Sequence, residues 1–173
     1  MWFEDIPLGG KITIGSYAFT EENIIAFARK YDPQPFHLDK DAAARSPYRG
    51  LIASGWHTAC VWMKLMIAYR DARVAAGEER TQANFVSPGV RDIRWIKPVR
   101  PGMIVTYTNE PFAKLDWTSL PQWGLIEGQN EAFAQDGTLV YSFINRVLIA
   151  RRPTRTSRWT SSESISTCTI RGT

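Results

Sequence analysis

Residues 32–37, which read DPQPFH, constrain this chain more than any other part of its sequence. A proline disfavours the helical conformation of the residue before it, so Asp32 and Gln34 are both expected to be extended and the preceding helix must end there. We therefore expect the backbone between Asp32 and His37 to be non-helical. Proline also restricts the unfolded chain, so a fixed bend that directs both side chains at one point costs little entropy.

A carboxylate and an imidazole on one rigid turn form a candidate general acid/base pair, because these side chains are best suited to moving protons near neutral pH. The alternative for Asp32 and His37 is an Asx-type turn with a surface histidine. The segment that follows favours the catalytic interpretation. Residues 49–59, RGLIASGWHTA, place Gly55 at the start of a long apolar stretch that continues to Ala68.

An Asp-x-x-x-x-His arm followed by a glycine at the mouth of an apolar helix resembles the MaoC-like dehydratases, the family of (R)-specific enoyl-CoA hydratases. The resemblance continues at residues 94–102 (RWIKPVRPG) and 147–152 (VLIARR), so it covers most of the chain up to position 152. It implies a hot-dog fold, in which an antiparallel sheet wraps around a long central helix. The sequence departs from the family at Gln34, where Asn is common, and at Phe36, where a smaller aliphatic residue is usual.

The order of the expected elements agrees with a single α+β domain. Residues 11–19 alternate between apolar and polar types, as a strand does, and Thr20 is a natural N-cap for a helix with Glu21 and Glu22 in its first turn. A second helix is expected over 54–75, closed by Gly77, and its near absence of charge predicts that it is covered on all sides. Further strands are expected over 90–96, 103–115, 123–134 and 138–151.

Composition is that of an ordinary globular domain, with 44% hydrophobic and 22% charged residues among 173. We place this domain at 1–152 and expect residues 153–173 to form a flexible tail, because 11 of the 20 residues from 154 to 173 are Ser or Thr. The net charge of +4 comes entirely from residues 151–173, since residues 1–150 hold 16 basic and 16 acidic side chains. This distribution argues against a nucleic-acid partner. Two cysteines make no disulfide framework, and Cys60 is expected to be a small buried core residue.

Hydration of an enoyl thioester needs a base for water, an acid for C2 and a donor for the thioester oxygen. We assign Asp32 as the base that polarises the water and His37 as the acid that protonates C2, while the opposite assignment stays open. The resemblance implies that the backbone N–H of Gly55 is the oxyanion donor, a role that suits an unpaired amide at the positive end of a helix. The alternative for Gly55 is a small residue chosen for close helix contacts.

Three further residues are expected to bind substrate: Ser54 and Trp56, which flank the glycine, and Gln34 in the arm. His57 lies on the same helix and is expected to be a core or surface residue. The sequence holds only two histidines, no Cys/His cluster and no phosphate-binding glycine motif, so we expect no metal and no cofactor other than the coenzyme A thioester that serves as substrate.

Two other functions remain open at this point. A hot-dog thioesterase would use an acidic residue on the central helix to position water, whereas residues 54–66 contain none. A non-catalytic module that binds acyl thioesters would not need the Asp/His pair. As partners we expect an acyl-CoA or acyl-carrier thioester and a second copy of the chain in a homodimer or larger homo-oligomer, because an exposed sheet edge is normally paired. Neither a membrane span nor a secretion signal is visible, so we expect a cytoplasmic protein.

Overall fold

One five-stranded antiparallel sheet forms the frame of the molecule in a computed structural model, which describes residues 1–81 and 87–153. The strand order is β1-β3-β4-β5-β2, and every pair of neighbours is antiparallel. The expected strands are confirmed to within two residues at each end, as β1 (Ile12–Phe19), β2 (Gly89–Trp95), β3 (Met103–Asp116), β4 (Trp123–Ala134) and β5 (Leu139–Ala150).

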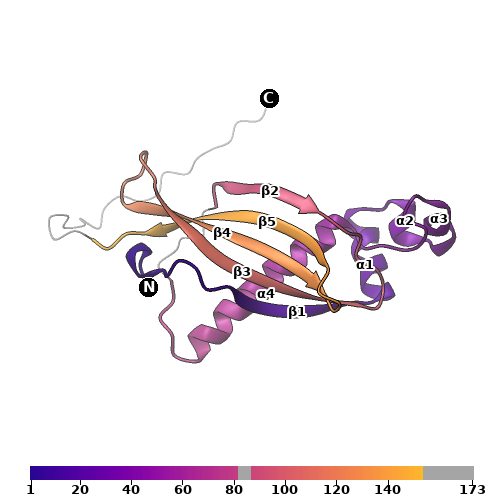
Figure 1. Ribbon diagram of the computed structural model, residues 1–173, viewed down its shortest axis with the longest axis horizontal. Coiled ribbons are helices and arrows are strands. Elements are labelled where there is room, and N and C mark those ends of the chain that lie inside the picture. Colours follow the sequence, from indigo (N-terminus) through magenta and orange to yellow (C-terminus); the bar gives the residue numbers. More distant parts are fainter. Residues whose placement is uncertain (82–86, 154–173) are drawn as a thin grey trace.

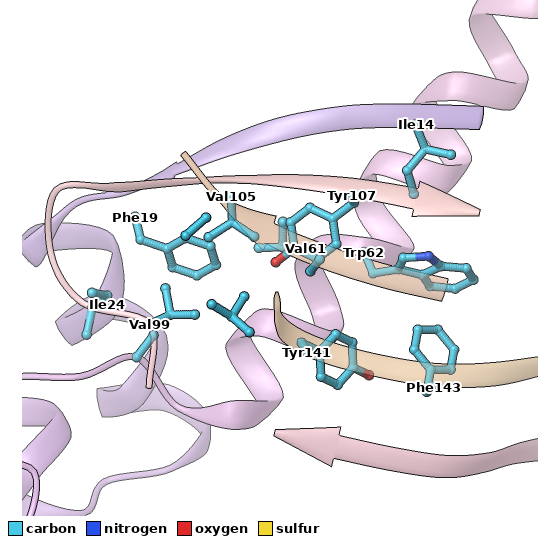
Figure 2. Packing of buried hydrophobic residues seen from close by; sticks show 14 of the residues in the cluster. Ile14, Phe19, Ile24, Val61, Trp62, Val99, Val105, Tyr107, Tyr141 and Phe143 are labelled. Carbon is cyan, nitrogen blue, oxygen red and sulfur yellow. The ribbon is translucent and has the colours of Figure 1, made fainter. Parts of the chain in front are cut away.

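The long helix α4 (Gly55–Ala75) crosses one face of this sheet (Figure 1). Ser54 caps its start, and Gly77 follows its end with a φ of 92°, a conformation that glycine adopts without strain. Val61 and Trp62 point from α4 into the core, where they meet side chains from three strands (Figure 2). The core residues labelled there on the strands are Ile14, Phe19, Val105, Tyr107, Tyr141 and Phe143. The hot-dog architecture expected from the sequence is thereby confirmed.

The sheet covers only one side of α4, which corrects the expectation of a fully covered helix. Four residues on its outer face are exposed at the spacing of a helical stripe: Trp56, Cys60, Met63 and Ile67. Cys60 is therefore not a core residue. An apolar helix surface can be buried by its own sheet or by another chain, and the sequence pattern does not distinguish the two.

The helices α1, α2 and α3 form a group at one end of the sheet (Figure 1). The helix α1 (Glu21–Tyr31) begins at Thr20, whose hydroxyl accepts a hydrogen bond from the amide of Asn23, as expected for this N-cap. Two short helices follow, α2 (Pro35–Leu38) and α3 (Lys40–Arg45), and a single 3-10 turn, η1 (Phe3–Asp5), precedes β1.

The helix α2 corrects the expectation of a non-helical arm. Gln34 has the extended conformation expected before proline, with φ of −79° and ψ of 141°, whereas Asp32 is non-helical but has a ψ of only 70°. Pro35, however, occupies the first turn of a helix, where its missing N–H is not needed and its fixed φ is already helical. The prolines therefore end one helix and begin another, and His37 lies within the second.

All of the proposed tail (153–173) except its first residue lies outside the described residues, so the domain boundary at 152 stays a prediction. Within the described part of the chain, no helix combines the length and the apolar character that a membrane span requires.

Candidate active site

The site lies where the arm between α1 and α2 meets the start of α4. Asp32 closes α1, with its backbone N–H bonded to the carbonyl of Ala28. Five residues later, the first turn of α2 directs His37 back toward it, and the Nε2 atom of His37 lies 3.4 Å from Oδ2 of Asp32. The bend expected from the two prolines therefore does bring the carboxylate and the imidazole together.

His37 is held in one orientation by the segment before α4. Its Nδ1 atom lies 2.8 Å from the backbone carbonyl oxygen of Ile52, and the residue is only 4% exposed. A carbonyl can only accept, so Nδ1 carries the hydrogen. In the neutral ring Nε2 is then unprotonated, and its lone pair is directed to the side of Asp32. This excludes the surface-histidine alternative.

Asp32 accepts a hydrogen bond at each carboxylate oxygen. The Ser54 hydroxyl donates to Oδ2 at 2.7 Å, and the Gln34 amide donates to Oδ1 at 2.8 Å. Burial alone would raise the pKa of Asp32, but these two donors and the nearby His37 outweigh it, so that the pKa lies below its usual value. The carboxylate is therefore ionised at neutral pH and can accept a hydrogen bond, but it is not an acid.

Gly55 is the first residue of α4, and its N–H makes no hydrogen bond within residues 1–81 and 87–153. The amide is thus free for a ligand at the positive end of a 21-residue helix. A second constraint also acts on this glycine. The Trp95 indole donates from Nε1 to the Gly55 carbonyl at 2.9 Å, and a Cβ on Gly55 would lie 2.6 Å from that nitrogen. Both interpretations of the glycine, ligand approach and close contact, fit its surroundings.

The three residues expected to bind substrate differ in accessibility. Trp56 is 57% exposed and lies edge-to-face with Trp95, with 5.4 Å between ring centroids. Gln34 is also exposed, although its amide is turned toward Asp32. Ser54 is 0% exposed, so its hydroxyl belongs to the interior of the site and not to its surface.

His57 takes no part in this arrangement. It is 5% exposed, stacks on Phe27 at 4.5 Å between centroids and touches the edges of Tyr17 and Phe19. Among the residues that the structure describes, its Nδ1 atom has no hydrogen-bond partner. Burial lowers the pKa of His57 to about 4, so the ring is neutral at physiological pH. His57 is thus a core residue, which is one of the two alternatives expected from the sequence.

Two features of the site have no signal in the sequence: the Ile52 carbonyl that fixes His37, and Trp95, which comes from the distant strand β2. The role of Ser54 had one signal, because serine directly before an apolar helix is a typical N-cap. Within the described part of the chain, no cluster of three or more His, Cys, Asp or Glu side chains is arranged to hold a metal ion.

Comparison with known proteins gives consistent matches. Residues 8–120 match the model of the MaoC like domain family. A relative, the uncharacterized protein YdeM of Bacillus subtilis (strain 168), is 29% identical over 90 residues, which is 51% of this chain and 64% of YdeM. The chain thus spans less than two thirds of that relative's length.

Two solved structures resemble the whole sheet and helix arrangement. The MaoC-like dehydratase from Rhodospirillum rubrum has a TM-score of 0.73 and 29% identity, covering 89% of this chain and 99% of that one. The (R)-hydratase from A. caviae, described as involved in PHA biosynthesis, has a TM-score of 0.62 and 22% identity, covering 87% and 99% of the two chains. At 22% identity the second likeness concerns the fold alone.

Proposed function

This chain belongs to the MaoC-like domain family, and we propose that it is a hydro-lyase that adds or removes water between trans-2-enoyl and (R)-3-hydroxyacyl thioesters. The observation that carries the proposal is the pair itself: an ionised Asp32 carboxylate lies 3.4 Å from Nε2 of His37, beside the start of α4. A binding module would have no need of such a pair.

In the proposed hydration, the attacking water makes hydrogen bonds to both side chains from one side of the pair. Asp32 accepts a hydrogen bond from the water and polarises it. As the water oxygen bonds to C3, its proton passes to Nε2 of His37, and the imidazolium that forms is stabilised by the Asp32 carboxylate. His37 then delivers that proton to C2, and dehydration follows the same steps in reverse. His37 keeps the acid role assigned from the sequence, but it also accepts the proton of the water, so Asp32 polarises the water without taking its proton. The mechanism uses the tautomer fixed by Ile52.

The thioester oxygen gains negative charge as water adds, and it needs a donor in place before the reaction begins. We assign the free N–H of Gly55 to this role. Because Asp32 and His37 share one arm, they approach the substrate from one face, so hydroxyl and hydrogen add to the same side. Trp56 and Gln34 are exposed beside this point, and we propose that they contact the acyl thioester.

The test is incubation of the protein with crotonyl-CoA. We expect the absorbance of the conjugated thioester to fall without release of free thiol, and chiral analysis to show only the (R) product. Asp32→Asn serves as the control for hydration by contaminants. Release of thiol with the double bond retained would show that the protein is a thioesterase and not a hydratase. An (S) product would contradict addition of hydroxyl and hydrogen from one face.

We also propose that the protein acts as a homodimer. The exposed stripe on α4 continues onto the edge strand β2 through the contact between Trp56 and Trp95, and Val90 on the same strand is 48% exposed. A second copy of the chain would cover this apolar surface and pair along the free edge of β2. The choice between coenzyme A and an acyl carrier protein, like the cytoplasmic location, stays a prediction.

A further inference from the structure

The hydroxyl of Ser54 joins the catalytic carboxylate to the central helix. It donates to Oδ2 of Asp32 at 2.7 Å and accepts from the backbone N–H of Trp56 at 3.2 Å. A hydroxyl has one hydrogen, so its direction is fixed by these two partners. One small side chain thus fixes the position of Asp32 relative to the first turn of α4, where the Gly55 amide lies.

Two other roles for Ser54 do not fit this geometry. At 0% exposure the hydroxyl does not reach a substrate, so it is not part of the binding surface. A serine nucleophile would donate its hydrogen to a base such as an imidazole nitrogen, whereas Ser54 donates to a carboxylate whose pKa is below its usual value.

The second donor to Asp32 provides a useful contrast. Gln34 bonds to the other carboxylate oxygen at 2.8 Å but is itself exposed, so water can replace its amide. Water cannot easily replace a donor that is completely buried, and loss of a hydrogen bond to a charged group in that position is costly. The two donors are alike in distance and differ in how well solvent substitutes for them.

We propose that Ser54 is a positioning residue, which holds Asp32 in place beside His37 and at a fixed distance from the start of α4. The catalytic part of this inference rests on the proposed function. The structural part, that Ser54 sets the orientation and ionisation of Asp32, does not.

The main variant is Ser54→Gly, because glycine at an N-cap destabilises a helix much less than alanine does. We expect kcat to fall about ten- to a hundredfold, the usual effect of losing a hydrogen bond to a charged group, with KM changed less than about threefold. We also expect the acid limb of the kcat profile to move to higher pH, because the carboxylate has lost a donor. Ser54→Thr, which keeps the hydroxyl, should restore both properties in part.

Three controls separate positioning from a structural role. Thr20→Gly makes the matched change at the N-cap of α1, which bonds to Asn23 and not to Asp32, and it should lower stability without moving the pH profile. Gln34→Ala should move the acid limb less than Ser54→Gly. If glycine at 54 prevents folding, Ser54→Cys supplies a far weaker donor of similar size and must show the same changes.

A measurement without substrate keeps the inference independent of the proposed reaction. In ¹³C NMR the side-chain carbon of Asp32, assigned with Asp32→Asn, should titrate at higher pH in Ser54→Gly than in the wild type. If no enoyl thioester is hydrated, the proposed function fails while this titration still decides the role of Ser54. An unchanged Asp32 titration overturns the inference, and so does a rise in KM with kcat unchanged, which would make Ser54 a substrate contact.

Discussion

Asp32 and His37 differ in solvent exposure, and this difference agrees with the different catalytic roles that we propose for them. The His37 side chain is 5% exposed and that of Asp32 is 18% exposed, so the carboxylate forms the open side of the pair. The Nδ1 atom of His37 is bonded to the carbonyl of Ile52, three residues before α4, which leaves Nε2 as the only free ring nitrogen. Both side chains are therefore needed, one to direct water and one to transfer its proton.

Replacing either member of the pair should remove most of the activity without unfolding the protein. Loss of a positioned acid or base typically costs about 10² to 10⁴ in rate, so we expect Asp32→Asn and His37→Ala each to lower kcat within that range. Steady-state kinetics with crotonyl-CoA measures the loss, and circular dichroism checks the fold. His57→Phe is the matched histidine control and should change kcat less than about tenfold. An essential His57 together with a dispensable His37 would refute the assignment.

The buried His57 predicts a specific pH dependence of stability. Its folded-state pKa of about 4 lies below the ordinary value of 6.5. Between these two pH values, His57 binds a proton in the unfolded chain but not in the folded chain. As pH falls from about 6.5 to about 4, the free energy of unfolding should fall by about 1.4 kcal/mol per pH unit from this group alone. His57→Phe keeps the ring contact with Phe27 and removes the titration. Urea unfolding of both proteins over this range gives the difference, and parallel pH curves would show that His57 does not titrate as we expect.

The sequence predicted the pair of Asp32 and His37, but it did not predict the contacts that hold these two side chains in place. Asp32 and His37 are five positions apart, so the two prolines between them give enough local information. Ser54, Ile52 and Trp95 act on residues 22, 15 and 40 positions away, and such contacts depend on how α4 lies against the arm and β2. Only the complete fold brings them together.

At the scale of elements, local signals predicted where the longer helices begin and end. Thr20 caps α1 and Gly77 closes α4, because each satisfies or permits a backbone geometry that few other residues do. The short helices α2 and α3 were missed. Their four and six residues are too few for an apolar period, and α2 begins at a proline that equally indicated an extended arm.

Gly55 has two candidate roles at the start of α4, as a donor to the substrate and as a close contact of Trp95. A double variant can separate the two roles. Gly55→Ala should reduce activity either because the ligand no longer approaches the amide or because the methyl group displaces Trp95. Trp95→Ala removes the second cause. If Gly55 serves the substrate, Gly55→Ala should still lower kcat/KM about tenfold or more in the Trp95→Ala background, because the methyl group hinders the contact between the Gly55 amide and the thioester oxygen. If it serves only the contact with Trp95, the second substitution should cost nothing further in kinetics or thermal stability.

At the scale of the whole molecule, the apolar surface of α4 and the free edge of β2 form one continuous region. A bulge between Arg91 and Arg94 interrupts the pairing of β2 with β5, which shortens the regular edge available to a partner. The stripe on α4 should therefore contribute most of the association. Nothing in the apolar sequence of this helix indicated which of its faces is buried within the chain and which is exposed.

The dimer should depend on this stripe and not on exposed apolar residues elsewhere. Ile67 is 51% exposed on α4, so Ile67→Glu would place a charge in the proposed interface, where burying it without a partner is costly. We expect the mass of two chains for the wild type in light scattering at micromolar concentration, and mainly the mass of one chain for Ile67→Glu. Ile104 is equally exposed, at 49%, but lies on the interior strand β3, so Ile104→Glu should remain a dimer. A monomeric wild type would contradict the dimer, and a shift in Ile104→Glu alone would move the interface from α4 to the opposite part of the sheet.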